Sequence, residues 1–197
     1  MRRDDKTMTN MEQPASPRLV RPVVLIGLMG AGKSSVGLRL AGMLGVPFVD
    51  SDDEIVAAAN MPIAEIFQKF GESHFRSGER RVIARLITET PRIIATGGGA
   101  FMDPETRAVV ASGATSVWLS AKLDLLISRT AGRTHRPILN KGNPRKILAD
   151  LVEQRYPIYA QADIEVPSRD GQSHEEMSRR IIEALVAHGS AVVDGEN

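Results

Sequence analysis

The stretch GLMGAGKSSVG, residues 27–37, decides the fold, and it directly follows the apolar run Val23–Ile26. Its glycines are costly in a strand or a helix, because glycine loses more backbone entropy on folding than any other residue. The stretch matches GxxxxGK[ST] as far as Ser34, a pattern that lets backbone N–H groups turn inward around an anion. It therefore predicts a loop that binds the phosphates of a nucleoside triphosphate, which we expect to be ATP.

Two side chains of this loop have predicted roles. The ammonium group of Lys33 is expected to reach the β- and γ-phosphates, and the hydroxyl of Ser34 is of the kind that ligates Mg²⁺. GTPases, motor ATPases and small-molecule kinases share such a loop, so the loop alone does not name a reaction.

Short apolar runs alternate with longer amphipathic stretches along the rest of the chain. We expect five strands, at 23–27, 46–50, 92–96, 115–120 and 162–166. Helical patterns lie at 33–44, 63–89, 104–112, 121–130, 144–156 and 173–188. Because most strands are apolar at consecutive positions, they indicate a parallel sheet covered on both faces. The alternation predicts a three-layer α/β/α sandwich of the P-loop NTPase type around a five-stranded parallel sheet.

One domain is expected over residues 20–188, between a mobile N-terminal tail at 1–19 and a C-terminal tail at 189–197. The segment AGRTHRPILNKGN at 131–143 interrupts the alternation with glycines, a proline and several basic residues. Such a composition predicts a long loop or a lid.

Composition narrows the classes of function. The 25 Lys and Arg residues balance 24 Asp and Glu residues, so nucleic acid is not the expected partner. The chain has no cysteine, which excludes disulfides and thiolate metal sites, and its four histidines lie too far apart for a metal site. No apolar run approaches the roughly 20 residues that span a bilayer. The N-terminal segment lacks the apolar core of a signal peptide, so we expect a cytoplasmic protein. We also expect a monomer, because the pattern of surface residues shows no extra apolar stripe for a partner.

Acidic residues follow the second predicted strand in VDSDDE, residues 49–54. Asp50 and Asp52 are two apart, so in an extended segment both project to one side. Because ligands bind at the carboxyl ends of the strands in open α/β sheets, this pair is expected beside the phosphate loop. The two carboxylates suit Mg²⁺ binding and proton transfer from a hydroxyl. The alternative is that Asp50 or Ser51 caps a following helix.

Two arginines fall on apolar helix stripes. Arg76 and Glu79 share a stripe with Ile83, and Arg155 lies four residues after Leu151. A charged group that faces inward is costly without a partner, so both arginines indicate an anionic ligand, with Glu79 orienting Arg76. A partly exposed salt bridge is the alternative for Arg76.

Three consecutive glycines, Gly97, Gly98 and Gly99, end the third predicted strand. Such a run favours the close approach of a backbone to a ligand, although a tight turn is the alternative.

Taken together, these motifs resemble the shikimate kinase family from about residue 22 to about residue 186. The resemblance rests on GLMGAGKSSVG, DSD, FRSGE, GGGA, RTHRP and QRYPIY, in the order and approximate spacing of the family. It implies transfer of the γ-phosphoryl group of ATP to the 3-hydroxyl of shikimate, a step of chorismate and aromatic amino-acid biosynthesis, with Mg²⁺ as the metal.

The resemblance also implies roles for individual residues. The ATP-binding residues are Gly30, Ala31, Gly32, Lys33, Ser34, Ser35, Arg129 and Arg136. The shikimate-binding residues are Asp52, Arg76, Gly97, Gly98, Gly99 and Arg155. Ser34 and Asp50 are the implied metal ligands, and Lys33, Asp52 and Arg136 the implied catalytic residues.

Within these sets, Asp52 is the implied base and Arg76 and Arg155 the clamp on the shikimate carboxylate. By the same resemblance, Arg136 is expected to close over ATP from the lid, and Arg129 to pack near adenine. Ser35 stands where threonine is common in the family, and His135 has no assigned role.

Two other functions remain open at this point. The first is a P-loop kinase for another small acceptor, such as gluconate or a nucleoside monophosphate. The second is a non-catalytic binding module gated by nucleotide, which would be expected to lose Lys33, Asp52 or Arg136.

Overall fold

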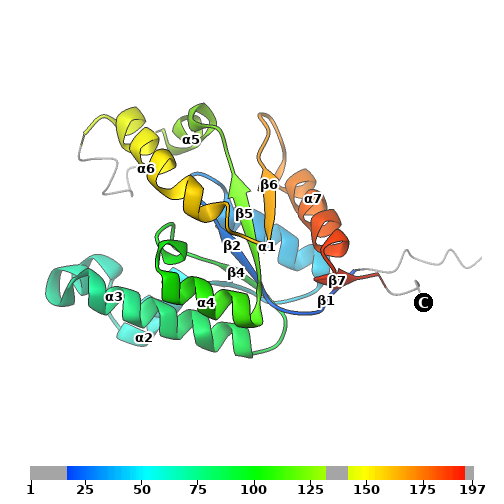
Figure 1. Ribbon diagram of the computed structural model, residues 1–197, viewed down its shortest axis with the longest axis horizontal. Helices are drawn as coiled ribbons and strands as arrows, with labels where there is room; N and C mark the ends of the chain where they lie inside the picture. Colours follow the sequence, from blue (N-terminus) through cyan, green and yellow to red (C-terminus); the bar gives the residue numbers. More distant parts are fainter. Residues whose placement is uncertain (1–16, 132–141, 194–197) are drawn as a thin grey trace, which may run out of the picture.

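The protein is described by a computed structural model over residues 17–131 and 142–193 (Figure 1). Its strands are β1 (Arg18–Leu19), β2 (Val23–Ile26), β3 (Phe48–Asp50), β4 (Ile93–Ala95), β5 (Thr115–Ser120), β6 (Ile164–Pro167) and β7 (Ala191–Val192). Its helices are α1 (Lys33–Leu44), α2 (Ser51–Ala59), α3 (Ile63–Thr88), α4 (Pro104–Gly113), α5 (Leu123–Thr130), α6 (Pro144–Tyr159) and α7 (His174–Ala187), with the 3₁₀ turn η1 (Ala100–Met102).

Five strands form one parallel sheet in the order β3-β4-β2-β5-β6. All residues of β2 and β5 are buried, as expected of strands covered on both faces. From β2 the chain passes first to the β3 side and later to the β5 side, so the strand order reverses at β2. A ligand is expected outside the carboxyl end of the strand at such a reversal, and the loop at 27–32 lies there. The predicted fold class is confirmed.

Helices cover both faces of the sheet. Helices α1 and α7 pack together on one face, and α3, α4 and α6 lie over the other (Figure 1). Helix α1 approaches the sheet closely at Gly37, where a Cβ would lie 2.7 Å from the ring of Phe48. This close packing fixes α1 against β2 and β3, because Gly37 also approaches Leu25.

Two helical segments differ from the prediction. Helix α2 was absent from the predicted helical stretches, although the capping alternative for Asp50 implied it, and the Asp50 carboxylate does accept a hydrogen bond from the N–H of Asp52 at 3.1 Å. Helix α6 continues past its predicted end, through Pro157, to Tyr159. A proline inside a helix loses its donated hydrogen bond and its ring clashes with the carbonyl four residues earlier, and here the helix ends two residues after it.

The structure differs from the expected domain boundaries at both ends. Strand β1 pairs antiparallel with β7, and the N–H of Val20 donates to the carbonyl of Ser190 at 3.0 Å. Leu19 and Ala191 are each only 2% exposed because they join the main core. The folded unit therefore includes residues that were expected in the two tails. Residues 1–16 and 194–197, and 132–141 of the predicted lid, lie outside the described residues.

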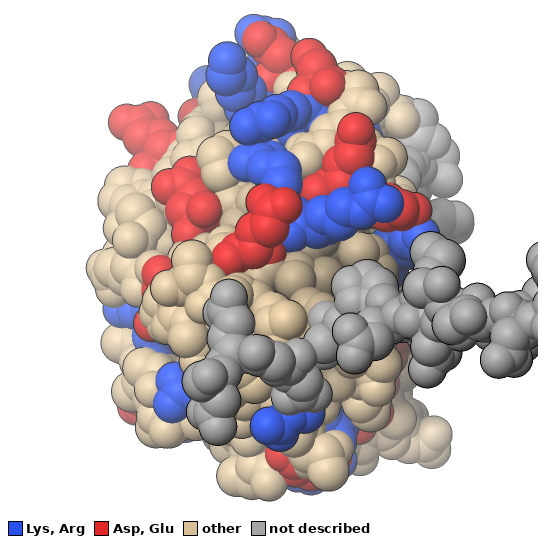
Figure 2. All heavy atoms as spheres, turned by 90° about the vertical axis from the view of Figure 1, so that its right-hand side faces the viewer, with Lys and Arg blue, Asp and Glu red and all other residues tan. Residues whose placement is uncertain are grey.

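Charges of both signs interleave on the face of the molecule shown in Figure 2. Glu175 of α7, for example, forms ion pairs with both Arg39 and Arg179. This mixture agrees with the nearly equal numbers of acidic and basic residues. Among the described residues, no helix combines the length and the apolar character needed to cross a membrane.

We predict that Leu19→Ala lowers the free energy of unfolding by about 2–3 kcal/mol, the usual cost of truncating a buried leucine. The matched control is Val20→Ala, because the side chain of Val20 is 55% exposed; it should change stability by less than about 0.5 kcal/mol. Urea unfolding of both variants is the measurement. Equal effects would show that β1 does not belong to the folded unit.

Candidate active site

The phosphate loop leaves β2 with a backbone that turns through glycines. Gly27, Gly30 and Gly32 have φ angles of 145°, 85° and 94°, which residues with side chains rarely adopt. Lys33 begins α1, and its Nζ donates to the carbonyls of Gly27 at 2.8 Å and Leu28 at 3.2 Å. The loop therefore curls around the ammonium group at a helix N-terminus, an arrangement that attracts phosphate.

The two predicted metal ligands meet at the end of β3. The hydroxyl of Ser34 donates to Asp50 Oδ2 at 2.8 Å, and this bond joins the phosphate loop to the neighbouring strand. Both are oxygen ligands of the kind that Mg²⁺ prefers, and Mg²⁺ commonly completes its shell with waters and phosphate oxygens. This fits the absence, within residues 17–131 and 142–193, of any cluster of three metal-ligating side chains. Asp50 caps α2 with its other oxygen, so the capping and metal hypotheses are compatible.

A cavity of about 450 Å³ opens in front of the phosphate loop. Asp50, Asp52, Gly97, Gly98 and Arg129 line it together with the loop, so these predicted residues share one site. One wall was missed by the sequence analysis and consists of Ser168, Gln172, Ser173, His174 and Met177. These residues surround the start of α7, where Ser173 and Glu176 form a capping box. That pattern marks a helix start but carries no sign of a cavity.

Asp52 faces the three-glycine segment from the first turn of α2. A Cβ added to Gly97 would lie 2.9 Å from Asp52 Oδ1, so any side chain at this position would push against the carboxylate. Oδ1 is buried and has no hydrogen-bond partner in the described part of the chain. Burial, and then the charge of Asp50, raise the pKa of Asp52, while Lys33 opposes the shift. The carboxyl group is therefore a stronger base than an exposed aspartate.

Arg76 and Glu79 form the inward ion pair that their spacing predicts. Arg76 Nη1 donates to Glu79 Oε2 at 2.6 Å, and Glu72 contacts the same guanidinium at 3.3 Å. The side chain of Glu79 is 1% exposed and that of Arg76 is 25% exposed. Burial raises the pKa of Glu79, and the hydrogen bond from Arg76 opposes the rise. The guanidinium is thus held by the protein on one side and is partly open on the other.

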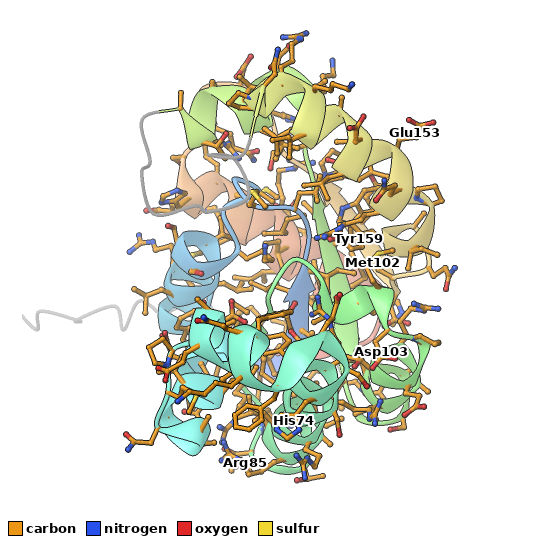
Figure 3. The ribbon with its side chains drawn as sticks, turned by 90° about the vertical axis from the view of Figure 1, so that its left-hand side faces the viewer. His74, Arg85, Met102, Asp103, Glu153 and Tyr159 are labelled. Atoms are coloured by element: carbon orange, nitrogen blue, oxygen red, sulfur yellow. The ribbon has the colours of Figure 1, made fainter. Side chains whose placement is uncertain are left out.

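Arg155 reaches the same segment from α6. Its Nη1 donates to the carbonyl of Gly98 at 2.7 Å, and the hydroxyl of Tyr159 donates to the same oxygen. In Figure 3, Tyr159 projects from α6 toward the segment that carries Met102. The guanidinium of Arg76 occupies the space that a Cβ on Gly99 would need.

The predicted acceptor residues therefore meet around one short segment, which approaches Asp52 at Gly97, Arg155 at Gly98 and Arg76 at Gly99. Arg136 lies outside the described residues.

The phosphate loop lies beside a protein carboxylate, that of Asp52, and two arginines. This combination defines the class of P-loop kinases that phosphorylate a small molecule. The family model described as shikimate kinase matches residues 29–186. The chain therefore belongs to the shikimate kinase family.

Individual relatives support this family assignment. A shikimate kinase of Paramagnetospirillum magneticum is 54% identical over 173 residues, which cover 88% of each chain. The solved structure of shikimate kinase from Acinetobacter baumannii in complex with shikimate is 33% identical, with a TM-score of 0.79 over 85% of this chain and 93% of that one. A gluconokinase structure from Sinorhizobium meliloti has a TM-score of 0.56 at 19% identity, over 86% of this chain and 94% of that one, which shows the fold alone.

We predict that Asp52→Asn stabilises the protein. Because the pKa of Asp52 is raised in the folded state, folding favours its protonated form, and the ionised form lowers stability at pH values above that pKa. Removing the charge should add about 1 kcal/mol, or about 3 °C in Tm for a chain of this size.

The matched control is Asp53→Asn in the same helical turn, where the side chain is exposed. It removes a favourable interaction with the N-terminus of α2 and a repulsion of Asp52 that is smaller than that of Asp50, so Tm should change little. Thermal unfolding at pH 7 compares the two variants. A lower Tm for Asp52→Asn than for Asp53→Asn would contradict the assigned cost of burying Asp52.

Proposed function

We propose that the protein transfers the γ-phosphoryl group of ATP to the 3-hydroxyl of shikimate, giving shikimate 3-phosphate and ADP for chorismate and aromatic amino-acid biosynthesis. The observation that carries the proposal is the convergence of Asp52, Arg76 and Arg155 on Gly97–Gly99, beside the cavity of the phosphate loop. A carboxylate and two guanidinium groups suit an acceptor that has both hydroxyls and a carboxylate. Shikimate is such a molecule, and it is the ligand named for the Acinetobacter baumannii structure.

ATP would lie with its phosphates in the loop. The N–H groups around Gly30 and Gly32 and the hydroxyl of Ser35 would bind the phosphate oxygens, and Lys33 would exchange the carbonyls it now contacts for the transferring group. Ser34 and Asp50 would hold Mg²⁺, which neutralises charge on the β- and γ-phosphates when bound.

Shikimate would lie across the three glycines. Arg76 and Arg155 would bind its carboxylate, and the backbone of Gly98 would approach the ring closely. Asp52 would accept the proton of the 3-hydroxyl as that oxygen attacks the γ-phosphorus, and the bond to the leaving ADP breaks. Its raised pKa favours this proton transfer, because a base is most effective when its pKa lies closer to the working pH.

Two further arginines complete the proposed site. Arg129 lines the ATP cavity and would pack near adenine, as the resemblance implies. Arg136, assigned from the sequence, would close over ATP and stabilise the transferring charge. Closure would exclude water, which otherwise competes as the acceptor. We further propose a cytoplasmic monomer whose ligands are ATP, Mg²⁺ and shikimate, with neither nucleic acid nor a membrane as partner.

Acceptor selectivity tests this function. Release of ADP from Mg-ATP is measured with shikimate, gluconate or AMP at equal concentration. Gluconate is the sharpest comparison, because it also combines a carboxylate with hydroxyls. We expect ADP release to depend on shikimate; comparable release with gluconate would mean that the acceptor is not shikimate alone.

We predict that Asp52→Asn lowers kcat by about 10²–10⁴-fold, the usual contribution of a general base. ATP binding should change little, since the proposed ATP contacts come from other residues. Steady-state kinetics and calorimetric titration with ADP measure the two effects. Turnover near the wild-type rate would remove Asp52 from the role of base.

We predict that Arg76→Lys weakens shikimate binding by about tenfold, because lysine keeps the charge beside Glu79 but loses the planar fork that binds a carboxylate through two hydrogen bonds. Affinity for ADP should be unchanged. The control is Arg81→Lys on the same helix, since Arg81 is exposed and forms no ion pair with any described residue. Equal shikimate affinity in both variants would refute the clamp.

A further inference from the structure

One residue of the motif QRYPIY contacts the three-glycine segment without a role in the proposed reaction. Tyr159 is the last residue of α6 and is 0% exposed. Its hydroxyl donates to the carbonyl of Gly98, the same oxygen to which Arg155 Nη1 donates at 2.7 Å. Two side chains of one helix therefore meet on a single backbone atom of the site.

The ring of Tyr159 is held by two other aromatic residues. It lies edge-on to Trp118 of β5, with ring centroids 6.1 Å apart, and 6.3 Å from Tyr156 of its own helix. Tyr156 also lies edge-on to Trp118 at 4.9 Å, and its hydroxyl donates to the carbonyl of Ala121 at 2.5 Å. Edge-on pairs at such distances are favourable. They attach the last turn of α6 to an interior strand of the sheet, so the sheet helps to fix the position of the Tyr159 hydroxyl.

A segment of three glycines needs anchors of this kind. Glycine has the widest choice of backbone conformations, and it has no side chain that could pack and hold the chain in place. The carbonyls of Gly97 and Gly99 accept from N–H groups of the following turn η1, at 3.1 and 3.0 Å. The carbonyl of Gly98 instead accepts from the two side chains of α6. The position of this peptide unit therefore depends on α6.

The two donors to Gly98 are not equivalent. A carbonyl oxygen has two lone pairs, so both donors can bond to it at once. A guanidinium has five N–H donors, so Arg155 can bind a substrate carboxylate and still hold Gly98. The hydroxyl of Tyr159 has a single proton, which it donates to Gly98. Burial raises the pKa of this hydroxyl and Arg155 opposes the shift, so the hydroxyl remains a donor at neutral pH.

A bond that fixes the Gly98 oxygen also orients the next N–H group. The peptide bonds of the described residues are all trans. In a planar trans peptide the N–H of Gly99 points away from the Gly98 carbonyl. The orientation of the Gly99 N–H therefore reports whether the carbonyl is held.

We propose that Tyr159 is a positioning residue, whose hydroxyl holds the Gly98 carbonyl and thereby keeps the Arg155 guanidinium oriented toward the substrate carboxylate. The proposal rests on the proposed function and adds a support to its carboxylate clamp. Without the hydroxyl, the peptide unit keeps one side-chain donor, which is itself at the end of a long side chain, so Gly98 and the guanidinium can move together. Arg155 would then be less well oriented for the paired hydrogen bonds that a carboxylate accepts.

The first test uses the ligand-free protein. Tyr159→Phe removes the hydroxyl but keeps the ring, and it should fold because the Gly98 carbonyl retains Arg155 as a donor. NMR relaxation of protein with labelled glycine amides measures the order of the Gly99 N–H. In the wild type we expect the order parameter of rigid backbone, about 0.85, and in Tyr159→Phe a fall toward the flexible value of about 0.6.

The matched control is Tyr156→Phe. The Tyr156 hydroxyl belongs to the same aromatic cluster but contacts the backbone of Ala121, away from the three glycines. This variant should leave the order of the Gly99 N–H unchanged. Equal order in the wild type and Tyr159→Phe would overturn the proposal. An equal fall in both variants would also overturn it, because the effect would then come from the packing of the cluster.

The second test separates the carboxylate from the rest of the substrate. Competitive calorimetric titration compares shikimate with its methyl ester, which lacks the negative charge. We expect Tyr159→Phe to weaken shikimate binding about fivefold, the usual effect of one lost hydrogen bond, and ester binding less than about twofold. The KM for shikimate should rise by a similar factor, with a smaller change in kcat. Tyr156→Phe should change neither affinity, and ADP affinity should be the same in all three proteins.

A purely structural role for Tyr159 predicts a lower Tm with the ratio of the two affinities unchanged, and this would overturn the proposal, as would equal weakening of shikimate and ester. Failure of the proposed function is distinguishable. A wild type that neither binds nor phosphorylates shikimate would overturn that function and with it this use of Tyr159. Shikimate turnover with an unchanged shikimate affinity in Tyr159→Phe would overturn the role of Tyr159 alone.

Discussion

The site depends on three consecutive residues without side chains at the end of β4. Gly97, Gly98 and Gly99 leave room for charged groups from three helices, so that a carboxylate and two guanidinium groups surround one short segment of backbone. The parallel sheet fixes this segment beside the phosphate loop, because β4 pairs with β2 and the carboxyl ends of both strands point the same way. A Cβ at Gly97 would crowd the Asp52 carboxylate, and one at Gly99 would displace the Arg76 guanidinium. The phosphate loop and the three-glycine segment are thus held side by side by the pairing of β2 with β4.

Burial of charge is the energetic consequence of this arrangement. Glu79 is fully buried with one oxygen unpaired, and Asp52 has a buried oxygen in the same condition. Groups of this kind lower stability, and they are typical of active sites, where function retains them. The cost is met by an apolar core that extends from the sheet to both helical layers and, at the chain ends, to Leu19 and Ala191. Stability and reactivity are therefore properties of different parts of the fold.

Much of the fold and of the candidate site could be predicted from the sequence. The apolar runs and the GxxxxGK[ST] pattern predicted the sheet and the loop because both depend on local chemistry, and the fold rules then placed Asp50 beside Ser34, where the structure has them 2.8 Å apart. The pairing of β1 with β7 could not be predicted, because strands of two residues carry no periodicity and their partner lies at the other end of the chain. The cavity wall at Ser168–Met177 likewise depends on tertiary packing, and so does the approach of Asp52 Oδ1 and Glu79 Oε1 to Gly97. A pattern along the sequence does not report such packing.

In the proposed reaction the hydroxyl presented to Asp52 receives the phosphoryl group. The product identifies that hydroxyl, and it can be determined by incubating the protein with Mg-ATP and shikimate and recording a phosphorus–proton correlation spectrum of the mixture. We expect one new phosphate ester, coupled to the proton on C3 of the ring and formed in step with ADP. An ester at another hydroxyl, or ADP formed at the same rate without shikimate, would contradict it.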